Sequence, residues 1–410
     1  QDGLLKGSGR SIAGFHLRDA LDLIGKRHPG LLRKFGGHAM AAGCTIGEGD
    51  FEVFEQALVR VAEAGLDASL LARQLPTDGP LPPECFTPEA VATGYERVQR
   101  LKQEMADGRR ARLAKLGFEP WAKSVEAASK GSIKVMLFPA QQLGKAADHY
   151  DMARDGIAEM TWVNPGYQAG RFPMIAAGEL PFLIGKPGPG SAALDQWYRP
   201  YAAAEMKDVK FCFAHVHIGT FHAKKPITEP GQLKGMKIRS ANGTVAQTMT
   251  LLGATNVQVS APEARDALDK GVADAITFPW NSIVSFGIDK AVKFHSDMRF
   301  YASDFVWVLN KPWYDKLAAG QKKVIDDHCN NEWAAKVGAA WGDEEDSGQG
   351  KLEKTAGHTI VPISPAQIDV WKKAVEPVYG QWVKAADAAG NKGQAALDDL
   401  RKELASRKAN

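Results

Sequence analysis

A polar, basic stretch from Gly94 to Gly117 divides this chain of 410 residues into two parts. It reads GYERVQRLKQEMADGRRARLAKLG and lies between two regions with regular hydrophobic patterning. It offers few positions for a core side chain, so one hydrophobic core could not run through it. The sequence therefore predicts two unlike domains, 1–93 and 118–410, joined by a basic linker helix over 94–117.

Composition excludes several classes of protein. The chain is 44% hydrophobic and 24% charged, which is typical of folded globular proteins. The formal charge of +3 is too small to indicate a nucleic-acid partner by itself. No stretch is apolar enough to span a bilayer, and the start lacks the pattern of a signal peptide. Because residue 1 is Gln, we expect a processed product or a fragment.

The cysteines and histidines give no pattern typical of a metal site. The four cysteines lie far apart, and we expect free, mostly buried thiols without a structural metal or cofactor. They are Cys44, Cys85, Cys212 and Cys329. His215 and His217 share one face of a predicted strand and could bind a metal, but no third ligand is in view. A half-buried strand is the favoured interpretation of this pair.

From Phe118 onward, short apolar runs alternate with amphipathic helical patterns. SIKVMLF, VKFCFAHVHI and VADAITF predict strands, whereas AADHYDMARDGI and LDQWYRPYAAAEM predict helices. This alternation predicts an α/β architecture of two lobes with largely parallel sheets, followed by helices over 321–341 and 365–388. Two lobes with terminal helices suit a protein that binds a small molecule in a cleft.

Candidate ligand-binding residues stand at the ends of predicted strands. Arg239 ends GMKIRS, at the sheet edge where α/β proteins bind ligands, and its guanidinium could hold a carboxylate. A lone arginine at such a place is more often a surface residue. Aromatic and amide side chains end two further strands, with core packing as the alternative role for the aromatic ones. These are Trp162, Asn164, Phe278, Trp280 and Asn281.

Glycine-rich turns surround one amphipathic helix in the first part of the chain. In KFGGHAMAAG, Gly36 and Gly37 permit positive φ and leave backbone N–H groups accessible. With Arg10 and His38 they could hold an anion. The alternative is a glycine turn before a helix that begins at Ala39.

Residues 1–91 resemble the C-terminal part of the single-strand-specific exonuclease RecJ, through KGSGRSI, HLRDAL, FGGHAMAAG, TDGPL and FTPE. The resemblance implies a small α+β DHH-associated domain of a cytoplasmic protein. It implies that Arg10, Gly36, Gly37 and His38 contact the backbone of single-stranded DNA. The catalytic DHH domain with its metal ligands has no counterpart in the sequence. We therefore expect no exonuclease activity, because nothing would activate water.

Six motifs occur in order in the second part of the chain: FEPWAKSVE, FPAQQLG, ELPFL, KPITEPGQLKGMKIR, APEARDALDKGVADAITFPW and FVWVLNK. Through them, residues 118–405 resemble the solute-binding proteins of TRAP transporters, the DctP family. The resemblance implies a two-lobe periplasmic-binding-protein-like fold, without enzymatic activity. The lobes would close on an organic acid, with Arg239 taking its carboxylate, and the closed form would dock on the TRAP membrane subunits.

Two differences from that family refine the expected ligand. Sialic-acid-type members carry Asn where this sequence has Phe278, which indicates a less polar acid that is short, branched or aromatic. These members also have a second arginine near the segment GTFHAKK, where His222 is the nearest polar side chain. His222 is therefore a weaker candidate for the ligand site.

The start of the resemblance predicts an incomplete first lobe. Family members begin with a strand that is central in the first lobe, whereas here the match opens at the following helix. We expect a first lobe without this strand, with exposed backbone edges and reduced ligand affinity. The two parts also imply different compartments, periplasm and cytoplasm. A fragment or a join of two reading frames is favoured over a natural fusion. Solute binding is the favoured function, and the alternative is an inactive nucleic-acid-binding remnant.

Overall fold

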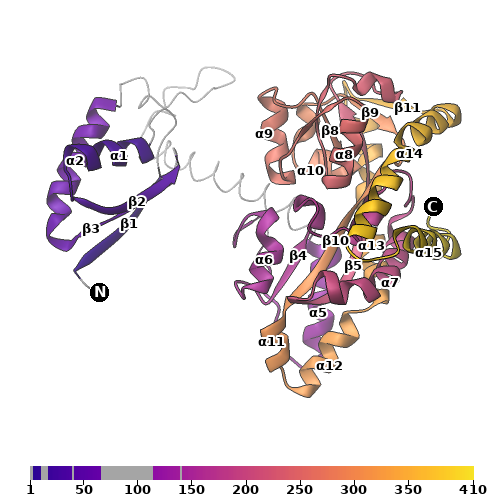
Figure 1. Cartoon of the computed structure of the whole chain (residues 1–410), viewed down its shortest axis with the longest axis horizontal. Coiled ribbons are helices and arrows are strands. Elements are labelled where there is room, and N and C mark those ends of the chain that lie inside the picture. Colours follow the sequence, from indigo (N-terminus) through magenta and orange to yellow (C-terminus); the bar gives the residue numbers. More distant parts are fainter. Residues whose placement is uncertain (1–2, 11–16, 39–40, 66–113, 139–140) are drawn as a thin grey trace, which may run out of the picture. The chain divides into compact units, whose positions relative to one another are not determined.

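The computed structural model describes residues 3–10, 17–38, 41–65, 114–138 and 141–410 (Figure 1). The chain divides into two compact units, Gln1–Glu96 and Arg97–Asn410. The division falls in the polar stretch that the sequence marks as a linker. Most of the predicted linker helix lies outside the described residues, but Ala114–Phe118 (η3) forms a π-helical turn that leads into the second unit.

The first unit contains an antiparallel sheet in the order β1-β3-β2 and two helices. Its elements are β1 (Leu4–Arg10), α1 (Leu17–Arg27), β2 (Leu32–His38), β3 (Ala41–Gly47) and α2 (Phe51–Gly65). Apolar side chains of both helices and the sheet pack into one core, including Leu21, Ile24 and Val61. The segment KFGGHAMAAG contributes to β2 and β3, so the alternative of a helix beginning at Ala39 is wrong. The pairing of β2 with β3 thus determines the structure of this segment, rather than the local preference of the glycines for a turn before a helix.

The second unit is built on eight strands. They are β4 (Met160–Val163), β5 (Val209–Ala223), β6 (Lys237–Arg239), β7 (Thr255–Val257), β8 (Ala275–Phe278), β9 (Phe294–Asp297), β10 (Tyr301–Asn310) and β11 (Thr359–Pro362). Six of them follow the order β11-β9-β5-β8-β6-β7, while β10 joins β5 and β4 joins β10. The first part of β5 pairs with β10 in one lobe, and its last four residues pair with β8 in the other. Strand β5 therefore belongs to both lobes.

The sheets are mixed, which differs from the largely parallel arrangement that the sequence predicted. Only the pairs β6–β7, β6–β8 and β9–β11 are parallel among the described strands. The long strand β5 runs antiparallel to β8, β9 and β10, and β10 runs antiparallel to β4. The reason is that two long antiparallel strands form the centre of the unit, which alternation of short runs cannot reveal.

Eleven α-helices of the described chain surround these strands. They are α5 (Glu119–Ala128), α6 (His149–Arg154), α7 (Pro187–Glu205), α8 (Gly243–Leu251), α9 (Ala264–Asp269), α10 (Trp280–Ser285), α11 (Lys311–Lys316), α12 (Ala319–His328), α13 (Asn331–Glu353), α14 (Pro365–Ala388) and α15 (Gly393–Ser406). Short 3-10 helices include η5 (Pro165–Tyr167), η6 (Ile175–Glu179) and η8 (Ala261–Glu263). No described helix is both long and apolar enough to cross a membrane.

The helix predicted over 321–341 is in fact two helices. Helix α12 ends at His328, and α13 begins at Asn331. Asn330 caps α13, because its Oδ1 atom accepts a hydrogen bond of 3.0 Å from the backbone N–H of Trp333. An asparagine at this position satisfies one of the free N–H groups at a helix start, so it both ends one periodic segment and starts the next.

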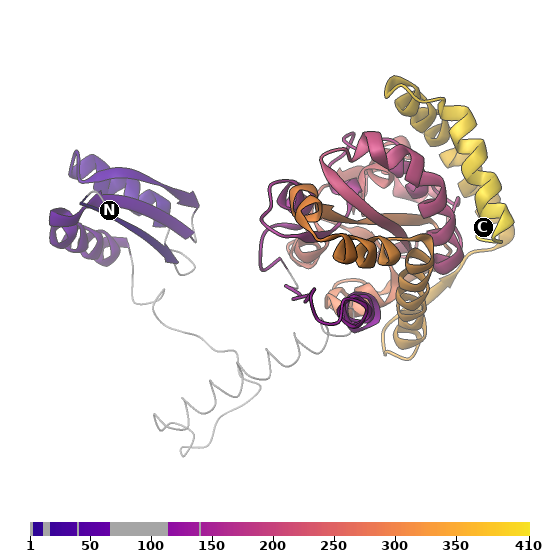
Figure 2. The same ribbon diagram turned by 90° about the horizontal axis from the view of Figure 1, so that it is seen from below.

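Helix α14 stabilises both lobes. Its residues Trp371 and Val375 belong to the core of the lobe that contains β6 and β8, whereas Val378 and Trp382 belong to the core beneath α7 and α15. All four side chains are at most 5% exposed. In Figure 2 the yellow C-terminal helices lie along one side of the unit. The apolar face of this helix thus packs against one core in its first half and against the other core in its second half.

The segment Ser132–Phe138 is not a strand, although SIKVMLF predicted one. Met136 is 76% exposed and Phe138 is 50% exposed, which is unusual for neighbouring large apolar side chains. Among the described strands, β4 pairs only with β10. Within the described residues, the first lobe therefore has an open strand edge at β4 and an apolar segment that pairs with no strand, in line with the expectation from the sequence. An apolar run forms a strand only where a neighbour supplies hydrogen bonds.

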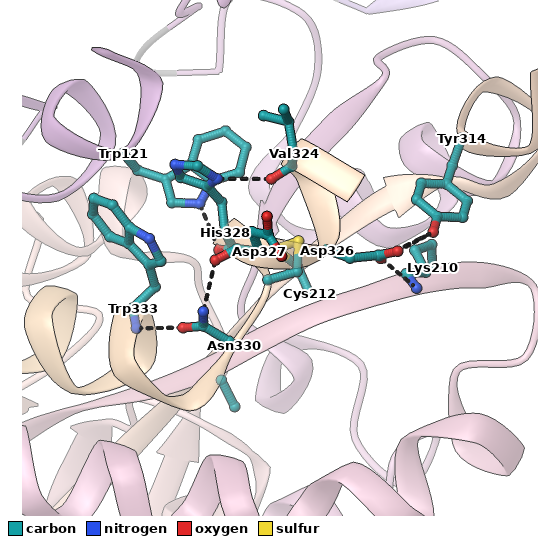
Figure 3. The surroundings of a disulfide bond; sticks show 12 residues. Trp121, Lys210, Cys212, Tyr314, Val324, Asp326, Asp327, His328, Asn330 and Trp333 are labelled. Carbon is teal, nitrogen blue, oxygen red and sulfur yellow. Dashed lines mark hydrogen bonds and ion pairs between the residues drawn. A yellow bond between two sulfur atoms is a disulfide. The ribbon is translucent and has the colours of Figure 1, made fainter. Parts of the chain in front are cut away.

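A disulfide links Cys212 of β5 to Cys329, directly after α12 (Figure 3). The expectation of free thiols is therefore wrong for this pair. Cys44 is free, and Cys85 lies outside the described residues. The end of α12 is also held by Trp121, whose Nε1 atom donates to the carbonyl of the residue before Cys329 (2.9 Å). The two cysteines are 117 residues apart, and only the tertiary fold brings them together.

Candidate ligand-binding site

Arg239 is the last residue of β6 and is completely buried. Its Nε atom donates a hydrogen bond to Val259 O (3.1 Å), and its Nη1 atom donates one to Thr277 O (3.4 Å). Its guanidinium carbon lies 5.2 Å from the centre of the Phe278 ring. The Nη2 atom is buried without a hydrogen-bond partner. Because an unsatisfied buried charged donor is unfavourable, this atom marks a place for an acceptor such as a carboxylate oxygen.

Two buried hydroxyl groups close to Arg239 in the fold also lack partners. They belong to Tyr301 of β10 and to Ser240, which directly follows β6. Burial raises the pKa of Tyr301 despite the opposing charge of Arg239, so its hydroxyl stays protonated at neutral pH. Tyr301 lies opposite Gly219 of β5, and the next residue of β5 pairs with Phe278. These hydroxyls and Arg239 Nη2 are three buried donors at one end of the strands.

An aromatic wall extends from this point along the same face of β10. Tyr301, Ser303 and Phe305 alternate along the strand and therefore share that face. Trp162 of β4 stacks on Phe305, with ring centroids 4.2 Å apart and planes at 8°. His217, opposite Ser303, lies 4.6 Å from the Phe305 ring. An apolar wall beside a buried cation is the combination that suits an aromatic carboxylate.

Trp341 of α13 covers this wall. Its ring centroid lies 4.6 Å from that of His217, 5.0 Å from that of His215 and 5.2 Å from that of Trp162. The Trp162 Nε1–H group donates to His215 Nε2 (2.9 Å). Together Trp162, His215, His217, Phe305 and Trp341 are termed the aromatic cluster. His215 Nδ1, His217 Nε2 and Trp341 Nε1 in this cluster are buried and have no hydrogen-bond partner.

The lobes touch around η5, which follows the predicted site residue Asn164. The Oδ1 atom of Asn164 accepts a hydrogen bond from Gly166 N (3.0 Å) and so caps η5. The Tyr167 hydroxyl at the end of η5 accepts one from Ala261 N (3.0 Å) at the start of η8. Asn242 Nδ2 donates to a carbonyl of β10 (3.2 Å). Asn164 therefore shapes the contact between lobes, and its Oδ1 atom is already used.

Trp280 and Asn281 are directed toward protein groups. Trp280 packs edge-to-face on His222, with ring centroids 5.2 Å apart. Asn281 Nδ2 donates to Glu344 Oε1 (3.0 Å), and its Oδ1 atom accepts from Lys351 Nζ (2.9 Å). These bonds attach α10 to α13. Their role here is to position the segment that follows Phe278.

His222 is completely buried and both of its ring nitrogens are engaged. Its Nε2 atom lies 3.0 Å from Phe278 O and its Nδ1 atom 2.7 Å from His295 Nδ1. His295 Nε2 is 2.9 Å from His358 Nδ1, and His358 Nε2 is 3.2 Å from Lys293 Nζ. A lysine only donates and a carbonyl only accepts, so each neutral ring accepts on the lysine side and donates on the carbonyl side. His222, His295, His358 and Lys293 form this histidine row.

The electrostatics of the histidine row agree with three neutral rings. Burial is the largest cause that lowers the pKa of all three histidines, to about 3 for His295. A protonated ring would place two N–H groups face to face within the row. Both ring nitrogens of His222 thus have protein partners, and His222 is left out of the ligand contacts proposed below.

In the first unit, the backbone brings the predicted anion-binding residues to one end of the sheet. Arg10 and His38 both pair with Ala41 of β3, from opposite sides. Gly36 and Gly37 pair with the next two residues of β3, and Gly37 has a φ of 135°, which favours glycine. The side chains of Arg10 and His38 lie outside the described residues. The sequence prediction for these four residues stays a prediction.

Other parts of the described chain give no competing site of this kind. The described residues contain no cluster of three or more His, Cys, Asp or Glu side chains that could hold a metal. A surface pocket of about 580 Å³ lies between α14 and α15, lined in part by Lys372, Lys373 and Arg401. Neither Arg239 nor any member of the aromatic cluster lines it, so it is separate from the candidate site.

The sequence analysis missed several residues of the candidate site. Tyr301 and Phe305 could have been found from their alternation in YASDFVWVLN, which places them on one strand face. His217 was considered only as a metal ligand. Trp341 gives no signal in the sequence, because it lies on α13, a helix that only the tertiary fold brings against the sheet.

Comparison with known proteins agrees with the fold of each unit. Residues 110–385 match the family of bacterial extracellular solute-binding proteins, family 7. This match covers more than half of the chain. The chain belongs to that family. Residues 1–64 match the DHHA1 domain, so this solute-binding protein also carries a segment of a second family, which is a chimeric arrangement.

Similar solved structures are TRAP solute-binding proteins. One is from Rhodoferax ferrireducens and holds copurified benzoate, with a TM-score of 0.68, 30% sequence identity, and coverage of 71% of this chain and 92% of that chain. Another, from a marine metagenome, is specific for aromatic acid ligands and holds 3-hydroxybenzoate, with a TM-score of 0.67, 32% identity, and coverage of 71% and 92%. Proteins of this family are periplasmic and are not enzymes.

The similarity to RecJ is confined to the first unit. RecJ of Escherichia coli is 50% identical over 88 residues, which are 22% of this chain and 15% of RecJ. The chain thus spans only about a seventh of the length of the RecJ relatives that it matches.

Proposed function

We propose that the second unit is an extracytoplasmic solute receptor that binds an aromatic carboxylate. The observation that carries the proposal is the Nη2 atom of Arg239, a buried charged donor without a partner at the end of an aromatic wall. A carboxylate accepts several hydrogen bonds and brings the missing negative charge. The benzoate and 3-hydroxybenzoate held by the two similar proteins support an aromatic acid.

Each group of the site has a role in this proposal. Arg239 pairs with the carboxylate, and the hydroxyls of Tyr301 and Ser240 donate further hydrogen bonds to it. Phe278 flanks the guanidinium, and the stacked rings of Trp162 and Phe305 pack against the apolar body of the ligand. Asn164, Trp280 and Asn281 position these groups from the lobe contact and from α10.

Lobe closure would convert binding into a signal. Strands β5 and β10 run side by side at the junction between the lobes, and the bond from Ala261 N to the Tyr167 hydroxyl joins the lobes next to the site. Ligand contacts from both lobes would favour the closed form. In this proposal the closed form docks on the membrane subunits of a TRAP transporter in the periplasm. The Cys212–Cys329 disulfide fits an oxidising compartment of this kind.

Titration calorimetry of the full chain with benzoate tests the proposal. Arg239→Gln keeps a polar side chain but removes the charge, and we expect about a 100-fold loss of affinity or more, as for other buried charge pairs. Arg239→Lys should bind only slightly better, because lysine cannot form two parallel bonds. Arg265→Gln, which removes a half-exposed arginine of α9, is the matched control and should leave the affinity unchanged.

An Arg239→Gln variant that binds benzoate within about threefold of the wild type would overturn the proposal. The same titration measures the effect of the open edge in the first lobe. The sequence predicts reduced affinity, so tight binding by the wild type would contradict that expectation while supporting the assignment of Arg239.

For the first unit, we propose at most binding of single-stranded DNA without cleavage. The similarity to RecJ supports this alternative, because it includes the segment with Gly36 and Gly37. Fluorescence anisotropy with a labelled oligonucleotide at several salt concentrations tests it, since phosphate contacts weaken steeply with salt. No binding at low salt would exclude it.

A further inference from the structure

Three rings of the aromatic cluster carry buried nitrogen atoms without partners. His215, His217 and Trp341 are 0%, 5% and 2% exposed. Their centroids form a triangle with sides of 4.6, 5.0 and 5.0 Å. His215 Nδ1, His217 Nε2 and Trp341 Nε1 have no hydrogen-bond partner. Buried polar atoms are nearly always paired, so three unpaired ones on adjacent rings indicate a missing polar group.

The positions of the hydrogen atoms on the ring nitrogens indicate which kind of polar group is missing. Trp162 Nε1–H donates to His215 Nε2, so the hydrogen of the neutral His215 ring is on Nδ1 and is free to donate. Trp341 Nε1 can only donate. Neutral His217 can accept at Nε2 when its hydrogen is on Nδ1. The triangle therefore offers two donors and one acceptor, and a hydroxyl group has two lone pairs and one hydrogen to match them.

A charged substituent would not suit the triangle. Burial lowers the pKa of His217 to about 3 and that of His215 well below its usual value, so neither ring is positively charged at neutral pH. An ionised group buried against neutral rings would lack a counter-charge. The missing group is thus polar and neutral.

The triangle lies at a suitable distance from the carboxylate-binding end. Tyr301 is close to Arg239 in the fold, and Ser303, two residues further along β10, lies opposite His217. Two residues of a strand span about 7 Å, which is comparable to the distance across a benzene ring from a carboxyl group to a ring hydroxyl. Trp162 and Phe305, whose rings stack on each other, belong to the same aromatic wall.

We propose that His217, Trp341 and His215 form a polar subsite for a hydroxyl group on the ring of the bound aromatic acid. The inference rests on the proposed function and extends it from aromatic acids in general to hydroxylated ones. His217 is then a specificity-determining residue, distinct from the arginine that holds the carboxylate.

Calorimetric titration of the full chain with benzoate, 3-hydroxybenzoate and 4-hydroxybenzoate tests the subsite. We expect at least one of the two hydroxylated acids to bind more tightly than benzoate, by a factor of about ten or more, because benzoate leaves the buried donors unpaired. His217→Phe keeps an aromatic ring but removes both nitrogen atoms, so the ratio of hydroxybenzoate affinity to benzoate affinity should fall to about one in this variant. His217→Gln keeps a donor and an acceptor and should retain part of the preference.

The outcomes separate this inference from the proposed function. If the wild type binds none of the three acids, the proposed function fails and the subsite fails with it. If it binds all three equally, or if folded His217→Phe keeps the preference, only the subsite is overturned. Near-ultraviolet circular dichroism verifies the fold of each variant. Should His217→Phe not fold, Trp341→Phe removes a single N–H group, and an unchanged preference in that variant overturns the subsite as well.

Discussion

The Cys212–Cys329 disulfide is expected to make a large contribution to the stability of the second unit. It closes a loop in which the two cysteines are 117 residues apart. The loop-entropy relation gives a loss of about 16 cal/mol/K in the unfolded chain, which corresponds to about 5 kcal/mol at 25 °C. Native disulfides contribute about 2 to 5 kcal/mol when measured. We therefore expect reduction to lower the free energy of unfolding by about 3 to 5 kcal/mol.

Urea unfolding followed by tryptophan fluorescence measures this effect in the second unit alone. All 10 tryptophans of the chain belong to that unit. At a slope of about 3 kcal/mol per molar urea, the midpoint should fall by about 1 to 1.7 M on reduction. Reduction keeps both sulfur atoms in place, so it separates the cross-link from the packing of Cys212. Cys44→Ser, in the first unit, should leave the fluorescence midpoint unchanged.

Two results would refute this reasoning. Equal midpoints before and after reduction would show that the cross-link has no influence on the unfolded chain. Four reactive thiols in the denatured, unreduced protein would show that the disulfide does not form, whereas we expect two, from Cys44 and Cys85.

Two further predictions concern pH. Burial raises the pKa of Glu345 to about 7, so its contribution to stability is present at low pH and is lost as the pH rises through 7; between pH 5 and pH 8 the wild type should lose about 2 to 3 kcal/mol more than Glu345→Gln. Glu353→Gln, at an exposed site of the same helix, is the control, and parallel pH curves for wild type and Glu345→Gln would contradict the prediction. The pKa of His295 is lowered, so its effect on stability has the opposite pH dependence: its contribution to stability is present above pH 6.5 and is lost as the pH falls toward 3. His295→Gln should therefore lose about 2 kcal/mol less than the wild type between pH 7 and pH 5 in urea unfolding, and an equal loss in both proteins would exclude a titrating His295.

Local sequence patterns predicted most elements of the second unit, because amphipathic spacing and strand ends reflect local packing. Helix α14 coincides with the predicted range 365–388. The prediction failed for Ser132–Phe138, since a strand depends on a neighbour that local pattern cannot supply. It also failed for Cys212 and Cys329, whose pairing is created by the contact of α12 with β5.

The candidate site shows the same division between local and long-range information. Arg239 was predicted from its place at a strand end, and the structure has it at the end of β6. Its burial and its free Nη2 atom depend on Val259 and Thr277, which come from later segments of the chain. His222 was predicted as a polar ligand group, but its partner His295 comes from a distant strand and uses the nitrogen atom that a ligand would need.

The histidine row has a direction as well as a structure. Each N–H bond in it points from Lys293 toward the carbonyl of Phe278, so the four bond dipoles add, and no single ring can reverse without the others. The half-buried amine of Lys293 thus fixes the direction of all the hydrogen bonds in the row. The inner end of the row is the residue whose ring lies against the guanidinium of Arg239. The electrostatic potential at Arg239 thus includes a contribution set near the surface of the lobe, on the far side of three histidine rings.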